Sequence, residues 1–148
     1  MESGIYDSVF ENAVSVLKKN QDLIITSCFS ETSFNEVVNY ASKKGITKQE
    51  TAGIVRNILG EITKKILADV EIGGLFLTGG DTAISIMHNL NTQGVEILHE
   101  VTPGVIASRL LDGLYKGLVI MTKAGSFGEE DTIDKCILKM KEVIIWII

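Results

Sequence analysis

The stretch Phe76–Met87, FLTGGDTAISIM, carries residues that suit the binding of an anion. An apolar run ends in Gly79 and Gly80, and Asp81 and Thr82 follow where a helical pattern begins. Glycine has no Cβ, so its backbone takes left-handed dihedral angles and lets a ligand come close. The first turn of a helix has N–H groups without an intrahelical acceptor and a partial positive charge, which suits phosphate. The pattern therefore predicts a phosphate site at this turn.

The same four residues also fit a plain turn in which Asp81 or Thr82 caps the helix. Either side chain could instead face a phosphate group or a metal ion. The spacing is neither the GxGxxG dinucleotide fingerprint nor the GxxxxGK[ST] P-loop, so neither of those nucleotide folds is indicated.

A second stretch, TKAGSFG, repeats the arrangement of an apolar run followed by glycines. Lys123 comes first, and Gly125 and Gly128 follow it. An ammonium beside glycine backbone suits a phosphate oxygen as a point charge. The alternative is a glycine-rich loop with an exposed lysine.

Three polar or glycine-rich stretches lie at the ends of predicted strands, namely Thr26–Ser27, TGGDT and TKAGSFG. In α/β sheets, ligands gather at the carboxyl ends of the strands, so these stretches predict one crevice that binds a phosphate-bearing ligand. Pro103-Gly104 indicates a turn. Glu100, just before it, could accept a ribose hydroxyl, hold a metal ion or be a solvated carboxylate.

The elements that must position these residues alternate between strands and helices. Short apolar runs predict buried strands at LIITS (23–27), GGLFLT (73–78), VEILHE (95–100) and GLVIMT (117–122). Helical spacing predicts helices over residues 6–20, 28–46 and 47–70. It also predicts a short helix with Ala83, Met87 and Leu90 on one face, and a last one that presents Ile133, Ile137 and Met140. This alternation predicts a single α/β domain over residues 1–148, with a mixed or mostly parallel sheet flanked by helices in three layers.

Helix boundaries have their own signals. Ser8 with Glu11, and Thr47 with Glu50, are spaced like capping boxes. Gly45 is expected to end the second helix, whose stripe is Phe34, Val37, Val38 and Ala41. Gly53 and Gly60 inside the third helix are expected to mark close packing.

Composition excludes several classes of protein. With 148 residues, 45% hydrophobic and 22% charged, the chain is long and apolar enough for one core. The net charge of −5 and the absence of a basic block argue against nucleic-acid binding. No signal peptide or membrane span is indicated. Cys28 and Cys136 have no metal-ligand spacing with His88 or His99. We therefore expect reduced cysteines, a cytoplasmic location and histidines that are structural or surface residues rather than catalytic bases.

Taken in order, the motifs LIITS, LFLTGGDTA, HEVTPGV and GLVIMTKAGSFGEEDTI resemble the C-terminal nucleotide-binding domain of the four-carbon acid sugar kinase family. The resemblance runs roughly over 23–133, and the long helix after Thr47 falls where that domain carries one. It implies an ATP-dependent kinase that phosphorylates sugar acids such as threonate, erythronate or their oxo forms. The residues implied to touch nucleotide are Ser27, Gly79, Gly80, Asp81, Thr82, Lys123, Gly125 and Gly128. Phosphoryl transfer usually needs Mg²⁺, and Asp81 is the implied residue on the metal side.

The chain departs from this family in lacking one motif and in ending in an apolar tail where the family's last helix usually has a polar end. The acidic DD-x-TG element of the family's N-terminal half, which resembles a sugar-acid site, does not occur here. We therefore expect the chain to be a fragment or a split subunit that is inactive alone. The alternatives are a non-catalytic nucleotide- or phosphate-binding module and an interaction subunit. The apolar tail Val143–Ile148 is expected to be buried in the core or against a partner chain.

Overall fold

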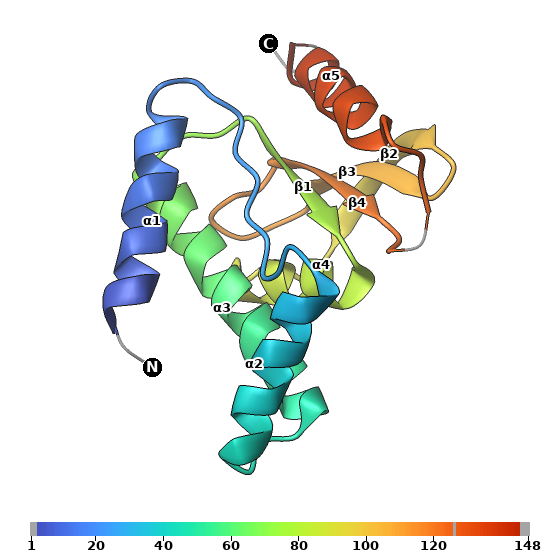
Figure 1. The fold of residues 1–148 in the computed structure, drawn as a ribbon. Helices are drawn as coiled ribbons and strands as arrows, with labels where there is room; N and C mark the ends of the chain where they lie inside the picture. The colour runs from blue at the N-terminus through green and yellow to red at the C-terminus, as the bar shows by residue number, and fades with distance from the viewer. Residues whose placement is uncertain (1–2, 126, 146–148) are drawn as a thin grey trace. The chain divides into compact units, whose positions relative to one another are not determined.

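The structure is a computed structural model that describes residues 3–125 and 127–145, with side-chain positions for 6–125 and 127–142. The chain forms two compact units, Met1–Val70 and Glu71–Ile148. Figure 1 shows the helices of the first unit and the sheet of the second. None of the helices within the described ranges is long and apolar enough to cross a bilayer.

The first unit consists of α1 (Ser3–Leu17), α2 (Glu31–Lys43) and α3 (Lys48–Asp69). Its core is the cluster of Ala13 with Ile62 and Ile66 of α3. The expected capping box of α3 is confirmed, because the Thr47 N–H donates to Glu50 Oε2 at 2.8 Å and the Glu50 N–H donates to Thr47 Oγ1 at 3.2 Å. Helix α3 is therefore fixed by local chemistry and by one buried stripe.

Three expectations about these helices are wrong or only partly right. Ser8 and Glu11 form no capping box, because α1 begins at Ser3 and both residues lie inside it. Gly60 is buried, but a Cβ added at Gly53 would meet no atom within 4 Å, so Gly53 does not mark close packing. On α2, which ends before Gly45 as expected, only Ala41 of the predicted stripe is buried.

The run Leu23–Ser27 is not a strand, which corrects the sequence prediction. Leu23 and Ile25 pack against the cluster of the first unit, while Ile24 between them is 72% exposed. A short apolar run does not reveal whether a strand is available to pair with it. The segment is therefore an apolar connection between helices, and the described residues provide it with no partner strand.

The second unit has a four-stranded sheet in the order β1-β4-β3-β2, formed by β1 (Gly74–Thr78), β2 (Val95–Thr102), β3 (Val105–Leu110) and β4 (Val119–Lys123). β1 and β4 are parallel, and β3 is antiparallel to both β4 and β2. The predicted mixed α/β sheet is thus confirmed, with β3 as a strand that the sequence patterns did not indicate. Pro103 and Gly104 form the expected turn, which joins β2 to β3.

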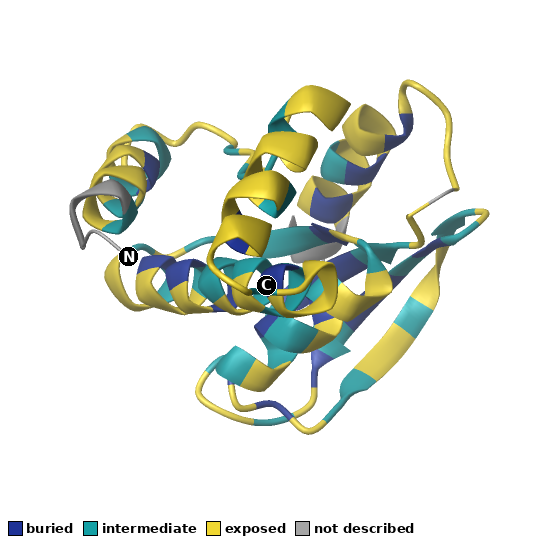
Figure 2. Cartoon of the chain, turned by 60° about the horizontal axis from the view of Figure 1, so that its bottom comes forward, coloured by how far each residue is buried: buried dark blue, intermediate teal, exposed yellow. Residues whose placement is uncertain are grey.

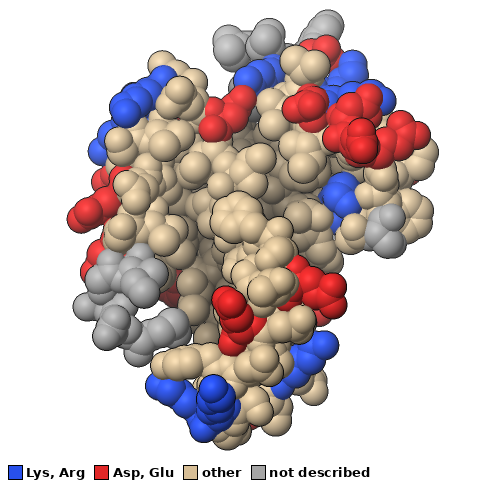
Figure 3. All heavy atoms as spheres, viewed as in Figure 1, with Lys and Arg blue, Asp and Glu red and all other residues tan. Residues whose placement is uncertain are grey.

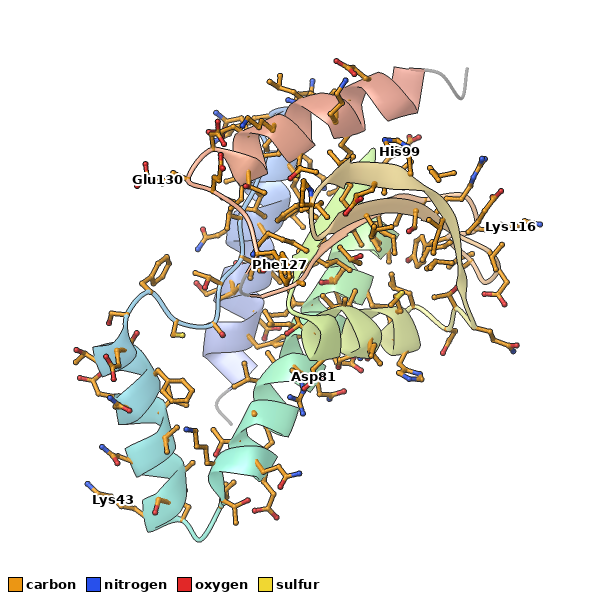
Figure 4. All side chains as sticks on the ribbon, turned by 90° about the vertical axis from the view of Figure 1, so that its right-hand side faces the viewer. Lys43, Asp81, His99, Lys116, Phe127 and Glu130 are labelled. Carbon is orange, nitrogen blue, oxygen red and sulfur yellow. The ribbon has the colours of Figure 1, made fainter. Side chains whose placement is uncertain are left out.

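Helices α4 (Gly80–Asn89) and α5 (Thr132–Ile145) cover opposite faces of this sheet (Figures 1 and 4). Under α5, Val119 and Met121 of β4 pack against Cys136 and Met140. The predicted apolar face of α5 is shifted, because Cys136 is fully buried while Ile133 is 39% exposed. Buried residues concentrate in β3 and β4, whereas edge strand β2 has only intermediate and exposed residues (Figure 2).

Charged groups of both signs are interspersed on the face that Figure 3 shows.

Within the described residues both cysteines are free, with Cys28 half-buried and Cys136 buried. The prediction that the tail Val143–Ile148 is buried lies outside the described side chains.

Candidate functional site

The glycine turn lies between β1 and α4. Gly79 has φ 88° and ψ 119°, a conformation that disfavours every residue with a Cβ, and it is the N-cap of α4. The N-cap residue is thus a glycine, so the expectation that Asp81 or Thr82 takes this position is wrong. Asp81 lies within the first turn instead, where its negative charge is favourable. The helix geometry leaves the first N–H groups of α4 without intrahelical acceptors.

The lysine loop starts beside this turn. Thr78 at the end of β1 is in register with Lys123 at the end of β4, and the Gly79 N–H donates to the Lys123 carbonyl at 3.0 Å. Because the two strands are parallel and adjacent, both of their carboxyl ends lie at the same edge of the sheet. The expectation that TGGDT and TKAGSFG follow strand ends is therefore confirmed, and the structure adds that the two strands are neighbours.

The turn between β2 and β3 lies at that same edge. Val105 pairs with Lys123, and the Ala124 N–H donates to the Gly104 carbonyl at 3.1 Å. Glu100 accepts a hydrogen bond from the Gly104 N–H at 3.1 Å. The Glu100 carboxylate thus stabilises the turn between β2 and β3, a role that the sequence did not suggest.

Phe127 covers this turn and was not predicted as part of the site. A Cβ added at Gly104 would lie 2.7 Å from the Phe127 ring, so only glycine permits the contact. The ring is nevertheless 54% exposed. In Figure 4, Phe127 and Asp81 lie toward one end of the sheet and Lys116 toward the other. The sequence signal that could have identified this contact is that Gly104 and Phe127 both lie near the ends of predicted strands.

Gly128 precedes α5 and lies against Thr132, another residue that the sequence analysis did not single out. A Cβ added at Gly128 would lie 2.8 Å from Thr132 Oγ1. Thr132 is buried and accepts a hydrogen bond from the Glu129 N–H at 2.6 Å. These contacts fix the entry of the loop into α5.

The eight predicted nucleotide-binding residues divide between the two units. Ser27 lies in the first unit, next to a turn in which Thr26 Oγ1 donates to the Cys28 carbonyl at 2.9 Å. The other seven lie in the second unit, where the strand register brings them to one edge of the sheet.

The chemistry available at this edge is that of an anion site. Among the described residues it has the amino end of α4, glycine backbone and the Lys123 ammonium. Within the described ranges, no group of three or more His, Cys, Asp or Glu side chains is arranged to hold a metal ion. His88 and His99 are exposed on α4 and β2, and Figure 4 shows His99 away from Asp81.

The chain matches a family model described as a nucleotide-binding C-terminal domain over residues 2–133. It is similar to the D-threonate kinase of Salmonella typhimurium, with 28% identity over 136 residues that cover 92% of this chain and 32% of the relative. It is also similar to the D-erythronate kinase of Heliobacterium modesticaldum, with 32% identity over 94 residues, 62% of this chain and 21% of the relative. The chain thus spans about a third or less of these relatives' length.

Solved structures agree with these matches. A Bordetella bronchiseptica domain of unknown function, crystallised with bound citrate as a domain-swapped dimer, is 34% identical with a TM-score of 0.57, covering 60% of this chain and 22% of that one. A Haemophilus influenzae protein has a TM-score of 0.67 at 16% identity, covering 88% of this chain and 31% of that one, and supports the fold alone.

Proposed function

The chain belongs to the family of nucleotide-binding C-terminal domains, and we propose from this membership that it binds ATP at the glycine-rich edge of its second unit. The observation that carries the proposal is the bond from the Gly79 N–H to the Lys123 carbonyl, which holds the amino end of α4 beside the lysine loop. The N–H groups at the start of α4 would donate to phosphate oxygens, and the helix dipole favours their negative charge.

We propose further that this domain serves a kinase that phosphorylates four-carbon sugar acids, as the names of its relatives suggest. The sugar acid would be bound by a part of the protein other than this chain, since the relatives are about three times as long. Such an enzyme is expected in the cytoplasm, where ATP is available.

Mg²⁺ fits this site as a companion of the nucleotide. Magnesium in nucleotide sites is commonly held by one or two carboxylates together with the phosphates themselves. Asp81, in the first turn of α4, is the proposed protein ligand. When bound, the metal would neutralise charge on the transferred phosphoryl group.

Calorimetric titration of MgATP into the wild-type chain and a Gly80→Val variant tests the proposal. A Cβ at Gly80 meets no atom within 4 Å, so valine should fit the fold and occupy the space proposed for phosphate. We expect saturable binding to the wild type and none to Gly80→Val. The matched control is Gly53→Val, because a Cβ there also meets no atom within 4 Å and Gly53 is outside the candidate site. Equal binding by all three proteins would refute the proposed site.

A further inference from the structure

The ammonium group of Lys123 donates hydrogen bonds to backbone carbonyls of its own loop. Nζ donates to the carbonyl oxygens of Ala124 at 3.0 Å, Gly125 at 3.0 Å and Phe127 at 2.7 Å. An ammonium has three N–H groups, so these bonds use all of its donors. Hydrogen bonds from a charged donor are stronger than neutral ones. In this conformation the side chain has no donor left for a phosphate oxygen.

The direction of these carbonyls fixes the direction of the N–H groups that follow them. In a planar trans peptide, the C=O of one residue and the N–H of the next point in opposite directions. Because the Ala124 and Phe127 carbonyls point toward Nζ, the N–H groups of Gly125 and Gly128 point away from it. The loop therefore turns its carbonyls inward to the ammonium and these two N–H groups outward.

The loop is also braced from its other side. The Ala124 N–H donates to the Gly104 carbonyl, and the Phe127 ring lies against Gly104. The Lys123 carbonyl meanwhile accepts the Gly79 N–H. The backbone of Lys123 therefore holds the glycine turn, while its side chain holds the loop.

From this geometry we infer that Lys123 is a positioning residue, which orients the loop so that the N–H groups of Gly125 and Gly128 face the phosphates of the nucleotide. The inference rests on the proposed function, and it differs from the point-charge contact that the sequence suggests. On this inference the affinity for the nucleotide comes from the shape of the loop rather than from the charge of Lys123.

The first test needs no nucleotide. Amide hydrogen exchange is measured at Ala124 and Phe127, whose N–H groups donate to the carbonyls of Gly104 and Ala124. In Lys123→Met the loop loses its central donor, so we expect about tenfold faster exchange at both amides, as for the loss of one charged hydrogen bond. Lys116→Met is the matched control, since Lys116 is exposed at the opposite end of the sheet (Figure 4). Unchanged exchange in Lys123→Met would overturn the inference.

The second test separates geometry from charge. Lys123→Arg keeps the positive charge, but its planar guanidinium cannot donate to three carbonyls around one nitrogen. We expect MgATP to bind about tenfold more weakly to both Lys123→Met and Lys123→Arg. We also expect the loss in Lys123→Arg to stay the same as salt rises, because this variant keeps the charge and screening acts on charge–charge interactions and not on loop shape. Recovery of affinity in Lys123→Arg, or a loss that shrinks with salt, would overturn the inference.

The two tests separate this inference from the proposed function. If the wild-type chain does not bind MgATP, the proposed function fails and the inference fails with it. If the wild type binds and only the exchange or arginine results differ from expectation, the inference alone fails.

Discussion

Two adjacent glycines in the turn before α4 should respond oppositely to the same substitution. Gly79 has φ 88° and ψ 119°, and a Cβ there would meet only Thr82 Oγ1 at 3.7 Å, an ordinary contact. The cost of Gly79→Ala is therefore torsional, roughly 1–3 kcal/mol in the free energy of unfolding. Gly80 begins the helix and a Cβ there meets nothing within 4 Å. Gly80→Ala should be neutral or stabilise by about 0.4–1 kcal/mol, by restricting the unfolded chain.

Thermal denaturation of the two variants measures this difference. At this chain length 1 kcal/mol corresponds to roughly 2–4 °C in Tm, so Gly79→Ala should lower Tm by roughly 2–12 °C. Gly80→Ala should leave Tm unchanged or raise it slightly. Urea denaturation, with unchanged m-values, would show that the variants differ in stability and not in compactness.

The comparison has a clear refuting result. Both residues lie in the same turn of the second unit, so a general loss of local structure would affect both variants equally. Equal losses of stability, or a larger loss for Gly80→Ala, would show that the left-handed conformation of Gly79 is not what requires glycine there.

Two further predictions concern the second unit. Asp112 accepts hydrogen bonds from Thr92 Oγ1 at 2.7 Å and the Gln93 N–H at 2.8 Å, and these bonds lower its pKa below the ordinary value. A carboxyl whose pKa is lowered by folding stabilises the protein above its unfolded-state pKa, and this stabilisation is lost as the pH falls through its folded-state pKa. Asp112→Asn should therefore lower the free energy of unfolding near neutral pH. The variant should also lose less stability than the wild type on acidification. Urea denaturation between neutral pH and about pH 3 measures this difference, with Glu130→Gln as the control. A change in the free energy of unfolding that is the same at every pH for Asp112→Asn would contradict the prediction. Gly74→Ala should destabilise by about 1–3 kcal/mol, because its Cβ would lie 2.6 Å from Met140 Sδ. In a Met140→Ala background the same change should cost less, and strictly additive free energies in this double-mutant cycle would argue against the contact.

Elements fixed by local interactions were predictable from sequence. Helix α3 has a capping box and one buried stripe, and both depend on residues three or four positions apart. β1 and β4 were recognisable as apolar runs that end in glycine-rich turns. Local signals failed where a partner decides the outcome. Leu23–Ser27 has the composition of a strand but no strand beside it among the described residues, and β3 becomes a strand because β2 and β4 flank it.

For the candidate site, the sequence by itself determined the chemistry: glycines that free the backbone, a helix that begins after them, and a lysine before a second pair of glycines. Only the tertiary structure decided that Gly79 lies beside Lys123, because the parallel pairing of β1 with β4 joins segments that are distant in sequence. It also decided that the Lys123 ammonium points at its own loop. A long, flexible side chain has many rotamers, and the acceptors that surround it, not its residue type, select one of them.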